Sequence, residues 1–344
     1  MLLNKGGKMV KKVNRAQVAQ AIGVSESTVS RALNDSPLIS EEVKNKVKKK
    51  AEELGYFPSR TATLFATGRS YSIGLVVPNF EKILPFTRSY FPSLLDGLLL
   101  GATNAGYNVG IVVSGKLGKY RNYIELVNSK SFDGLVFAVS PEHEESSAEL
   151  IKNHIPFVLV NNYCEGASSV YAKPDIGMEK AFLHAASLGH HDIGYICGDL
   201  NYKNGEDRLE IFKQLAAKFN MKSEIVSGDF SYHSGYDGFK KFGSKLGKEI
   251  GLVMTSCDRQ AFGLIDACHD NGINVPKQLS IIGYDNFVAS NPYALTTVDH
   301  PITNMGNEAA RLLIKMIEKK DYYTEQIWVD TDFVIRNTTS RRLK

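Results

Sequence analysis

Apolar side chains recur at helical spacing in three short stretches near the start of the chain. In the stretch VNRAQVAQAIG, Val18 and Ile22 stand four positions apart, so both lie on one face of a helix. Asn14 is suited to the N-cap of this helix, and Gly23 is suited to end it. The pattern therefore predicts a first short helix between Asn14 and Gly23 with one buried face.

The next stretch, GVSESTVSRALNDSP, predicts a second short helix capped by Ser25. Val29, Ala32 and Leu33 share a face and are expected to pack on the first helix. The other face carries small polar residues and one arginine, namely Ser27, Ser30, Arg31 and Asn34, with Glu26 in the first turn. Two short helices joined at a glycine match the helix-turn-helix unit, whose second helix lies in the major groove of DNA. Such a face is therefore predicted to contact DNA.

A third helix is predicted after Ser40, which is suited to cap it. Its buried stripe is expected to consist of Val43, Val47, Ala51 and Leu54. Its solvent side is expected to carry five lysines, namely Lys44, Lys46, Lys48, Lys49 and Lys50. Such a run is either a solvated face or a source of non-specific attraction to phosphates, and the sequence favours neither interpretation.

From Tyr71 onward, short apolar runs alternate with helical stretches. The runs are IGLVVP, NVGIVVS, DGLVFAV and FVLVNN, and the pattern repeats with IGYICG, EIVSGD, IGLVMTS and LSIIGYD. Apolar runs separated by helices predict parallel sheets that are covered on both faces. The predicted fold class is therefore α/β, with a small all-α head and two doubly wound subdomains. A ligand crevice is expected outside the carboxyl ends of their strands.

Charge is unevenly distributed along the 344 residues, whose net charge is +4. Residues 1–70 contain 13 Lys and Arg against 6 Asp and Glu, which gives the head a charge of +7 and leaves −3 for the rest. A basic head on a slightly acidic body predicts that the head alone attracts a polyanion. A solvated charged head is the alternative, and charge alone does not decide between them.

Several classes of protein are disfavoured by what the sequence lacks. No apolar run approaches the roughly 20 residues that a membrane span needs, and MLLNKGGKMVKK lacks the apolar region of a secretory signal. Four cysteines without paired spacing predict free thiols in a cytoplasmic protein, without a metal or a disulfide framework. The motifs GxGxxG, GxxxxGK[ST], HExxH and GxSxG do not occur, so we predict neither an enzyme nor a cofactor.

The run GVSESTVSRALN, followed by EELGY, resembles the N-terminus of the LacI/GalR (lactose-repressor) family of bacterial transcription regulators. The later stretches LGHHDIGYICG, GDFSYHSGY, NVPKQLSIIGYDN and LTTVDHPITNMG agree with this family, so the resemblance covers the chain from about Val13 onward. It implies a body like that of the periplasmic sugar-binding proteins. It also implies a tail at residues 1–8, a DNA-binding head at 9–58, a hinge at 59–70 and a core at 71–344.

Within that core, the resemblance implies an N-subdomain at residues 71–167 and 300–325 and a C-subdomain at 168–299 and 326–340. The hinge of the family folds over the minor groove of the operator, where one apolar side chain kinks the DNA. This wedge falls on Phe65, with Leu64 beside it, although a linker whose Phe65 packs on the body is the alternative.

The helix-turn-helix interpretation assigns roles to the outward residues of the second helix. Base edges are expected to meet Glu26, Ser27 and Arg31, with Glu26 preferring the amino group of a cytosine. Phosphates are expected to be contacted by Thr28, Ser30 and Asn34.

The resemblance also implies an effector site in the crevice. Phe230 matches an aromatic residue that stacks on the effector, while Arg208 and Asp285 match a cation and an anion that orient it. Tyr90 and Phe91 begin a helix where some members place aromatic contacts. Each residue has a structural alternative: Phe230 in the core, Arg208 in a surface ion pair, and Asp285 as a strand-end cap.

Two positions depart from the family pattern. An Asp-Asn pair of the family is here Lys173-Pro174, and the Asn-Asp of another motif is here Cys257-Asp258. We expect Lys173, Cys257 and Asp258 to line the effector site. A lysine in place of an aspartate makes a ligand with a phosphate or carboxylate more plausible.

Together these observations predict a cytoplasmic, homodimeric repressor that binds near-palindromic operator DNA. A small molecule between the two subdomains is expected to control it: a sugar, a sugar phosphate or a nucleobase-like compound. The first alternative is an activator or global regulator of the same family that uses a protein partner. A solute-binding protein is a further alternative, which the basic head and the missing signal peptide oppose.

Overall fold

The computed structural model of the chain describes residues 13–57, 67–79, 86, 88–138, 143–287, 293–319 and 324–342. These residues form two compact units. The first comprises Met1–Tyr71 with Ser129–Asp133, and the second comprises Ser72–Asn128 with Gly134–Lys344. The predicted tail at residues 1–8 and most of the predicted hinge lie outside the described residues.

The described residues of the first unit include the helices α1 (Arg15–Ile22), α2 (Glu26–Leu33) and α3 (Glu41–Glu53). Asn14 and Gln17 form a capping box at α1, and Gly23 ends α1 with a φ of 71°, a conformation that glycine adopts without strain. The side chains of Ser25 and Ser40 cap α2 and α3 by accepting from a main-chain N–H three residues on. The three predicted helices and their caps are thus confirmed.

Six small apolar side chains hold these three helices together. They come from all three helices and are almost fully buried: Val18, Ala19, Val29, Ala32, Val47 and Ala51. Burying each of them contributes up to about 1–2 kcal/mol, so the short helices are stable together although each is marginal alone. The buried face of α2 fixes which of its side chains point outward.

The second unit contains two sheets of six strands each. The first has the order β11-β5-β4-β3-β1-β2, with all neighbours parallel. Its strands are β1 (Ser72–Val77), β2 (Asn108–Val113), β3 (Gly134–Phe137), β4 (Phe157–Val160), β5 (Ser168–Lys173) and β11 (Gln326–Asp330). Its helices are α5 (Tyr90–Asn104), α6 (Tyr123–Asn128), α7 (His143–Lys152) and α12 (Ile302–Lys319).

The second sheet has the order β12-β10-β9-β8-β6-β7 and is parallel except at β12. Its strands are β6 (Asp192–Ile196), β7 (Lys222–Val226), β8 (Leu252–Thr255), β9 (Ser280–Asp285), β10 (Thr296–Asp299) and β12 (Asp332–Val334). Its helices are α8 (Pro174–Ser187), α9 (Lys203–Lys218), α10 (Tyr232–Phe242), α11 (Asp258–Asp270) and the 3-10 turn η2 (Gly243–Lys245). The predicted pair of parallel α/β subdomains is confirmed.

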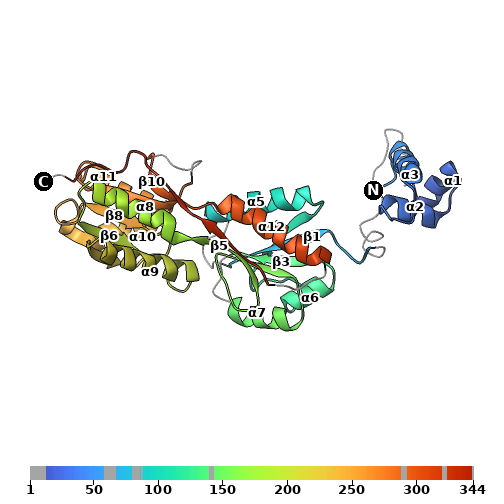
Figure 1. Cartoon of the computed structure of the whole chain (residues 1–344), viewed down its shortest axis with the longest axis horizontal. Coiled ribbons are helices and arrows are strands. Elements are labelled where there is room, and N and C mark those ends of the chain that lie inside the picture. Colours follow the sequence, from blue (N-terminus) through green and yellow to red (C-terminus); the bar gives the residue numbers. More distant parts are fainter. Residues whose placement is uncertain are drawn as a thin grey trace. The chain divides into compact units, whose positions relative to one another are not determined.

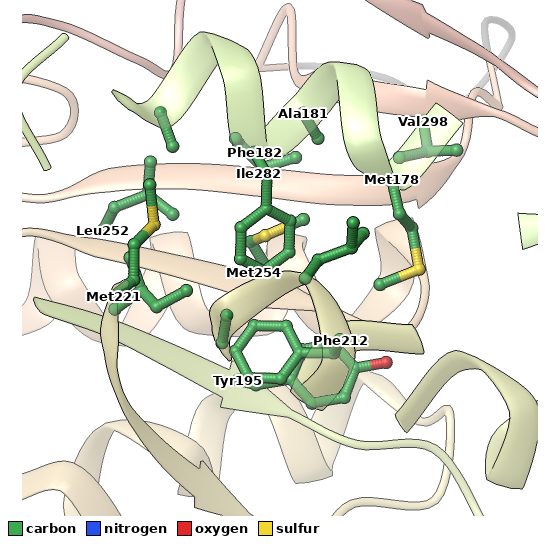
Figure 2. Close-up of a cluster of buried hydrophobic side chains, with 14 of the residues drawn as sticks. Met178, Ala181, Phe182, Tyr195, Phe212, Met221, Leu252, Met254, Ile282 and Val298 are labelled. Carbon is green, nitrogen blue, oxygen red and sulfur yellow. The ribbon is translucent and has the colours of Figure 1, made fainter. Parts of the chain in front are cut away.

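One face of the second sheet packs on α8 and α9 through a cluster of buried side chains, which Figure 2 shows. The rings of Tyr195 and Phe212 stack with their centroids 4.3 Å apart, and Phe182 lies 5.5 Å from Phe212. The sulfur-containing side chains Met178, Met221 and Met254 complete the cluster. Because this core fixes α9 against β6, it also fixes the side chains on the opposite face of α9.

The chain passes between the two sheets at three places: from β5 to α8, from β10 to α12, and from β11 to β12. The first and third passages come one strand later than expected, because β5 and β11 both belong to the first sheet. Thr331 is the single residue between β11 and β12. Its hydroxyl donates to the carbonyl of Lys173 (2.6 Å) and accepts from the N–H of Gly177 (2.9 Å), which ties two of the passages together.

Helices α5 and α12 lie side by side against the first sheet (Figure 1). Their close approach depends on glycines at the crossing. A Cβ atom on Gly97 would lie 1.8 Å from the carbonyl oxygen of Thr303, and one on Gly306 would lie 2.3 Å from that of Leu94. In the described part of the chain, no helix is long and apolar enough to cross a membrane.

Replacing Gly97 with alanine is expected to destabilise the second unit by about 2–3 kcal/mol, because the added methyl group must push α12 away. Alanine is otherwise the better helix former by about 1 kcal/mol, so helix propensity alone predicts the opposite sign. Urea denaturation followed by circular dichroism measures the difference. The control is Asn104→Ala at the exposed end of α5, and an unchanged or raised stability of Gly97→Ala would refute the close approach.

Candidate functional site

Helix α2 presents the predicted DNA-facing residues on the side opposite its buried stripe. Val29 and Ala32 are fully buried, whereas Glu26, Ser27 and Arg31 are exposed. The inward residues therefore orient the helix so that the three predicted base-contacting side chains reach solvent together. This placement is what contact with a DNA groove requires.

The residues predicted to contact phosphates also make hydrogen bonds within the head. The hydroxyl of Ser25 lies 2.7 Å from that of Ser27 and 2.9 Å from that of Thr28, and it accepts from the N–H of Thr28. The side-chain amide of Asn34 donates to the carbonyl of Ser30 (2.8 Å) at the end of α2. These bonds restrict the rotamers of the small polar side chains before any ligand arrives.

Glu26 forms an ion pair with Arg15 of α1, with 3.1 Å between Nε and Oε2. Both side chains are about half exposed, so the pair contributes at most about 1 kcal/mol to stability. It orients the carboxylate of Glu26 toward α1. Arg15 therefore helps to position one of the predicted base contacts.

The lysine run on α3 differs from the prediction at one position. Lys44 was expected on the solvent side, but it is buried with 7% of its surface exposed and pairs with Glu41 (2.7 Å). A lysine can bury its aliphatic part while its ammonium group reaches a carboxylate, as the ammonium of Lys44 does at Glu41. Lys46 and Lys48 also pair with carboxylates, so part of the positive charge is compensated within the head. Leu64 and Phe65, the predicted wedge, lie outside the described residues.

A cavity in the second unit brings together six of the eight residues predicted to bind an effector. Its empty volume is about 580 Å³, with the open solvent at its mouth included. Three helices begin in its wall: α5 at Tyr90, α9 after Tyr202, and α11 after Cys257. The lining residues are Arg88, Ser89, Tyr90, Phe91, Tyr202, Asn204, Arg208, Phe230, Cys257, Arg259, Asp285 and Phe287.

Two predicted effector residues are not in this wall. Lys173 lines a separate depression together with Tyr163, Tyr171 and Trp328, because it ends β5 on the first sheet. Asp258 is fully buried, and its carboxylate accepts from the hydroxyl of Thr297 (2.6 Å) and from the N–H of Phe287 (2.9 Å). Burial and the nearby Asp285 raise the pKa of Asp258 to about 7.

Arg208 is the most deeply buried cation of the cavity, with 4% of its surface exposed. Its guanidinium donates to the carbonyl of Ser256 and lies 3.7 Å from the carboxylate of Asp285. Its Cζ atom stands 3.7 Å from the ring centroid of Tyr284 and 5.8 Å from that of Phe230. The alternative of a surface ion pair is therefore wrong, since this arginine is held inside the protein.

His300 joins this group from the passage between β10 and α12. Its Nδ1 lies 3.1 Å from Oδ1 of Asp285, and its Nε2 lies 3.4 Å from the amide nitrogen of Asn161. Burial and the charge of Arg208 lower the pKa of His300 well below its ordinary value, so the ring is neutral. Nδ1 also lies 3.3 Å from Nη2 of Arg208, so His300 contacts both members of the Arg208–Asp285 ion pair.

The same amide nitrogen of Asn161 donates to the hydroxyl of Tyr90 (2.9 Å), whose ring stacks near His300 with centroids 6.3 Å apart. Burial raises the pKa of Asp285 to about 7, although Arg208 acts in the opposite direction. The cavity thus contains a connected polar network drawn from both sheets. A ligand hydroxyl that reached it would find donors and acceptors already oriented.

Two lining residues adopt backbone conformations that side chains rarely take. Phe230 has a φ of 62° and Asp285 a φ of 125°. Such conformations cost about 1–3 kcal/mol each and persist where the surrounding structure enforces them, often at ligand sites. The position of the Phe230 ring depends on Gly198, because a Cβ atom at Gly198 would lie 2.1 Å from Cζ of Phe230. This contact leaves the ring half-buried in the cavity wall.

Sequence reasoning missed Arg88, Asn204, Arg259 and His300. The positions of three of them in the sequence could have indicated the site. Asn204 and Arg259 lie in the first turns of helices that follow strands, and His300 directly follows a strand. In parallel sheets these positions converge at one edge. Arg88 precedes α5 in a segment that has no such pattern.

Two family models match the chain. The model described as bacterial regulatory proteins of the lacI family matches residues 16–59, and the model described as a periplasmic binding protein-like domain matches residues 182–339. The first match contains α2, and the second contains Arg208, Phe230, Arg259 and Asp285.

Individual proteins match over nearly the full length. The ribose operon repressor of Halalkalibacterium halodurans is 31% identical over 326 residues, which cover 94% of this chain and 96% of the relative. The transcriptional repressor PurR of Edwardsiella ictaluri is 30% identical over 334 residues, which cover 94% and 96%. The solved structure of the lac repressor dimer bound to operator and the anti-inducer ONPF matches with a TM-score of 0.76 at 21% identity. The matched region covers 96% of this chain and 100% of the lac repressor chain, so the two proteins share the fold.

The contact between Gly198 and Phe230 is testable without a ligand. We expect Gly198→Ala to lower the free energy of unfolding by about 1–3 kcal/mol, because the new methyl group displaces the ring. In a Phe230→Ala background the same change is expected to cost less than about 0.5 kcal/mol, since the ring is gone. Denaturant titration of the four proteins completes the double-mutant cycle. Equal costs in both backgrounds would show that the ring does not rest on Gly198.

Proposed function

Because the chain belongs to the lacI family of bacterial regulatory proteins, we propose that this DNA-binding transcriptional regulator is a repressor under small-molecule control. Members of this family are regulators of transcription rather than enzymes. In the proposal, two copies bind a near-palindromic operator, and an effector in the core cavity changes their affinity for it. The main support for DNA binding in this proposal is the exposed face of α2, which combines a carboxylate, hydroxyls and one arginine.

At the operator, α2 of each copy enters the major groove of one half-site. Arg31 bonds a guanine edge, Glu26 accepts from a cytosine amino group, and Ser27 contacts a neighbouring base. Thr28, Ser30 and Asn34 approach phosphates and fix the register of the helix. The wedge residues Leu64 and Phe65 of the hinge are assigned to the minor groove at the centre of the site.

The homodimer of the proposal is supported by an apolar surface on the first sheet. Leu99 and Leu100 of α5 are 38% and 53% exposed, and Ile111 of the adjacent edge strand β2 is 50% exposed. Large apolar side chains exposed on neighbouring elements are typical of an interface between subunits. The solved lac repressor of the same fold is a dimer on its operator.

The effector is assigned to the cavity around Phe230 and Arg208. Its wall contains residues that precede helices of both sheets, so a ligand there contacts both subdomains. A ligand that favours one arrangement of the subdomains changes operator affinity, and the operator changes ligand affinity by the same factor. The aromatic side chains and oriented polar groups suit a ring that carries hydroxyls, as in a sugar or a nucleobase-like compound.

The DNA-binding half is tested by selection from random duplexes with the purified chain, alone and with metabolite mixtures. We expect enrichment of a near-palindromic site. Glu26→Ala is expected to relax the preference at one position of each half-site, with a loss of about 1–3 kcal/mol of discrimination there.

The control for this selection is Glu52→Ala, which removes an exposed carboxylate of α3 and the same charge from the head. Both variants gain non-specific affinity for duplex DNA because one negative charge is lost, but only Glu26→Ala changes the selected sequence. The proposal fails if the wild-type chain enriches no symmetric site under any condition. The role of Glu26 fails if its variant selects the wild-type sequence.

The dimer is tested by Leu100→Asp, which places a charge on the exposed apolar surface of α5. We expect sedimentation velocity to show dimers for the wild type and monomers for the variant at micromolar concentration, because burying an unpaired charge is costly. Leu200→Asp is the control, since Leu200 is 45% exposed and lies in the segment between β6 and α9. Dimers that survive in Leu100→Asp would exclude this surface.

A further inference from the structure

A hydrogen bond outside the effector cavity joins the two subdomains. The hydroxyl of Tyr171 on β5 donates to Oδ2 of Asp207 on α9, with 2.6 Å between the two oxygen atoms. Strand β5 lies inside the first sheet, between β4 and β11, whereas α9 packs on the second sheet. The two partners therefore belong to different subdomains, and the length of the bond depends on how the subdomains are arranged.

Helix α9 is fixed to the second sheet by its buried side chains. Phe212 and Leu215 of α9 lie in the same core as Tyr195 of β6 (Figure 2). Because such a core is closely packed, the helix moves with its sheet. A hydrogen bond is lost once its partners separate by about 1 Å. A small rotation of one subdomain against the other is therefore enough to break the bond between Tyr171 and Asp207.

Asp207 is also bound by a lysine one turn earlier on α9. Nζ of Lys203 lies 2.8 Å from Oδ1 of Asp207, so both oxygens of this carboxylate are engaged. The same ammonium group stands 5.6 Å from the ring centroid of Tyr163, which follows β4 in the first subdomain. Lys203 thus holds the carboxylate in place and adds a second contact between the subdomains.

On the side of the first subdomain, aromatic neighbours hold Tyr171 in place. Its ring centroid lies 5.3 Å from that of Tyr163 and 5.6 Å from that of Trp328 on β11. Tyr171 is buried, and burial together with Asp207 raises the pKa of its hydroxyl, which therefore keeps its proton and remains a donor. Because a buried hydroxyl without a partner is unfavourable, the bond favours the arrangement of the subdomains in which it forms.

This bond and the effector cavity share one turn of α9. Asp207 lines the depression that also contains Lys173 and Trp328, while the next residue, Arg208, lines the cavity. A ligand that displaces Arg208 also displaces the turn that carries Asp207. Conversely, whatever holds Asp207 against the first sheet fixes the distance between Arg208 and the residues that the first subdomain contributes to the cavity.

We propose that the bond between Tyr171 and Asp207 is a latch that holds the subdomains in one arrangement, and that an effector acts on operator binding by keeping or breaking it. Tyr171 and Asp207 are positioning residues, since neither lines the cavity. A hydrogen bond to a charged acceptor is strong enough to change the ratio of two arrangements by about tenfold or more. The regulatory meaning of the latch rests on the proposed function, whereas the bond itself does not.

The latch is tested by fluorescence, because Trp328 is the single tryptophan of the chain and lies beside Tyr171. Tyr171→Phe removes the hydroxyl and keeps the ring, and Asp207→Ala removes the acceptor. We expect acrylamide to quench Trp328 more strongly in either variant, because α9 forms one wall of the depression around Trp328 and moves away. The double variant is expected to show no more than the larger single effect, since both changes break the same bond.

The matched control is Tyr236→Phe. It removes a hydroxyl that donates to Asp270 (2.8 Å), between α10 and α11 of the same subdomain, and it is expected to leave the quenching of Trp328 unchanged. Circular dichroism and thermal melting establish that each variant is folded.

The regulatory role is tested by operator affinity, measured on a duplex that the wild-type chain selects. We expect this affinity to change by about fivefold or more in Tyr171→Phe and in Asp207→Ala, and by less than about twofold in the control Tyr236→Phe. A change in either direction supports the latch, and its sign identifies whether the latched arrangement binds the operator more tightly or more weakly.

Three results would overturn the proposal: wild-type quenching in both latch variants, effects that add in the double variant, or operator affinity as little changed as in the control. Operator selection keeps the two levels apart. A wild-type chain that selects no symmetric site contradicts the proposed function, while the quenching series still tests the bond. A chain that selects a site but binds it with unchanged affinity in the latch variants contradicts the latch alone.

Discussion

The burial of the Arg208 guanidinium is the constraint on which the core cavity depends. Removing this charge from water costs several kcal/mol unless its donors are satisfied, and the partners come from chain segments far apart in sequence. Ser256 and His300 directly follow β8 and β10, and Asp285 is the last residue of β9; these three strands are neighbours in one parallel sheet. Because the carboxyl ends of parallel strands share an edge, the topology that buries the cation also delivers its partners. The cavity is therefore a property of strand order as much as of individual residues.

How much of the fold and of the cavity was predictable from the sequence depends on how far apart in the sequence the interacting residues lie. The head was predictable because its caps and buried stripe involve residues three or four positions apart, as with Ser25 and Thr28. The two parallel sheets followed from apolar runs, and Arg208, Phe230 and Asp285 followed from a family resemblance. Lys173 was expected at the cavity because it stands where the family has an Asp-Asn pair, and the stretch SSVYAK does not itself indicate which sheet it joins. Its pairing with β11, more than 150 residues later, places it elsewhere.

Helix α5 connects features that the sequence presents separately. Its first residues, Tyr90 and Phe91, line the cavity, its middle crosses α12 at Gly97 without space for a methyl group, and Leu99 and Leu100 lie exposed beyond the crossing. A helix packed this closely moves with its neighbour as one body, because close-packed interiors transmit displacement rather than absorb it. We infer that a shift at the cavity end of α5 reaches its exposed leucines with little loss.

The hydroxyl of Thr331 has a mechanical consequence. The two hydrogen bonds of this hydroxyl hold the passage after β5 and the passage before β12 side by side, so the two segments form one band. Two passages joined in this way can bend together, but the hydrogen bonds resist sliding of one passage along the other. We infer that bending at this band is the easiest relative motion of the two subdomains. A valine in place of Thr331 has the same shape but would remove both hydrogen bonds, so the two passages would no longer be held to each other.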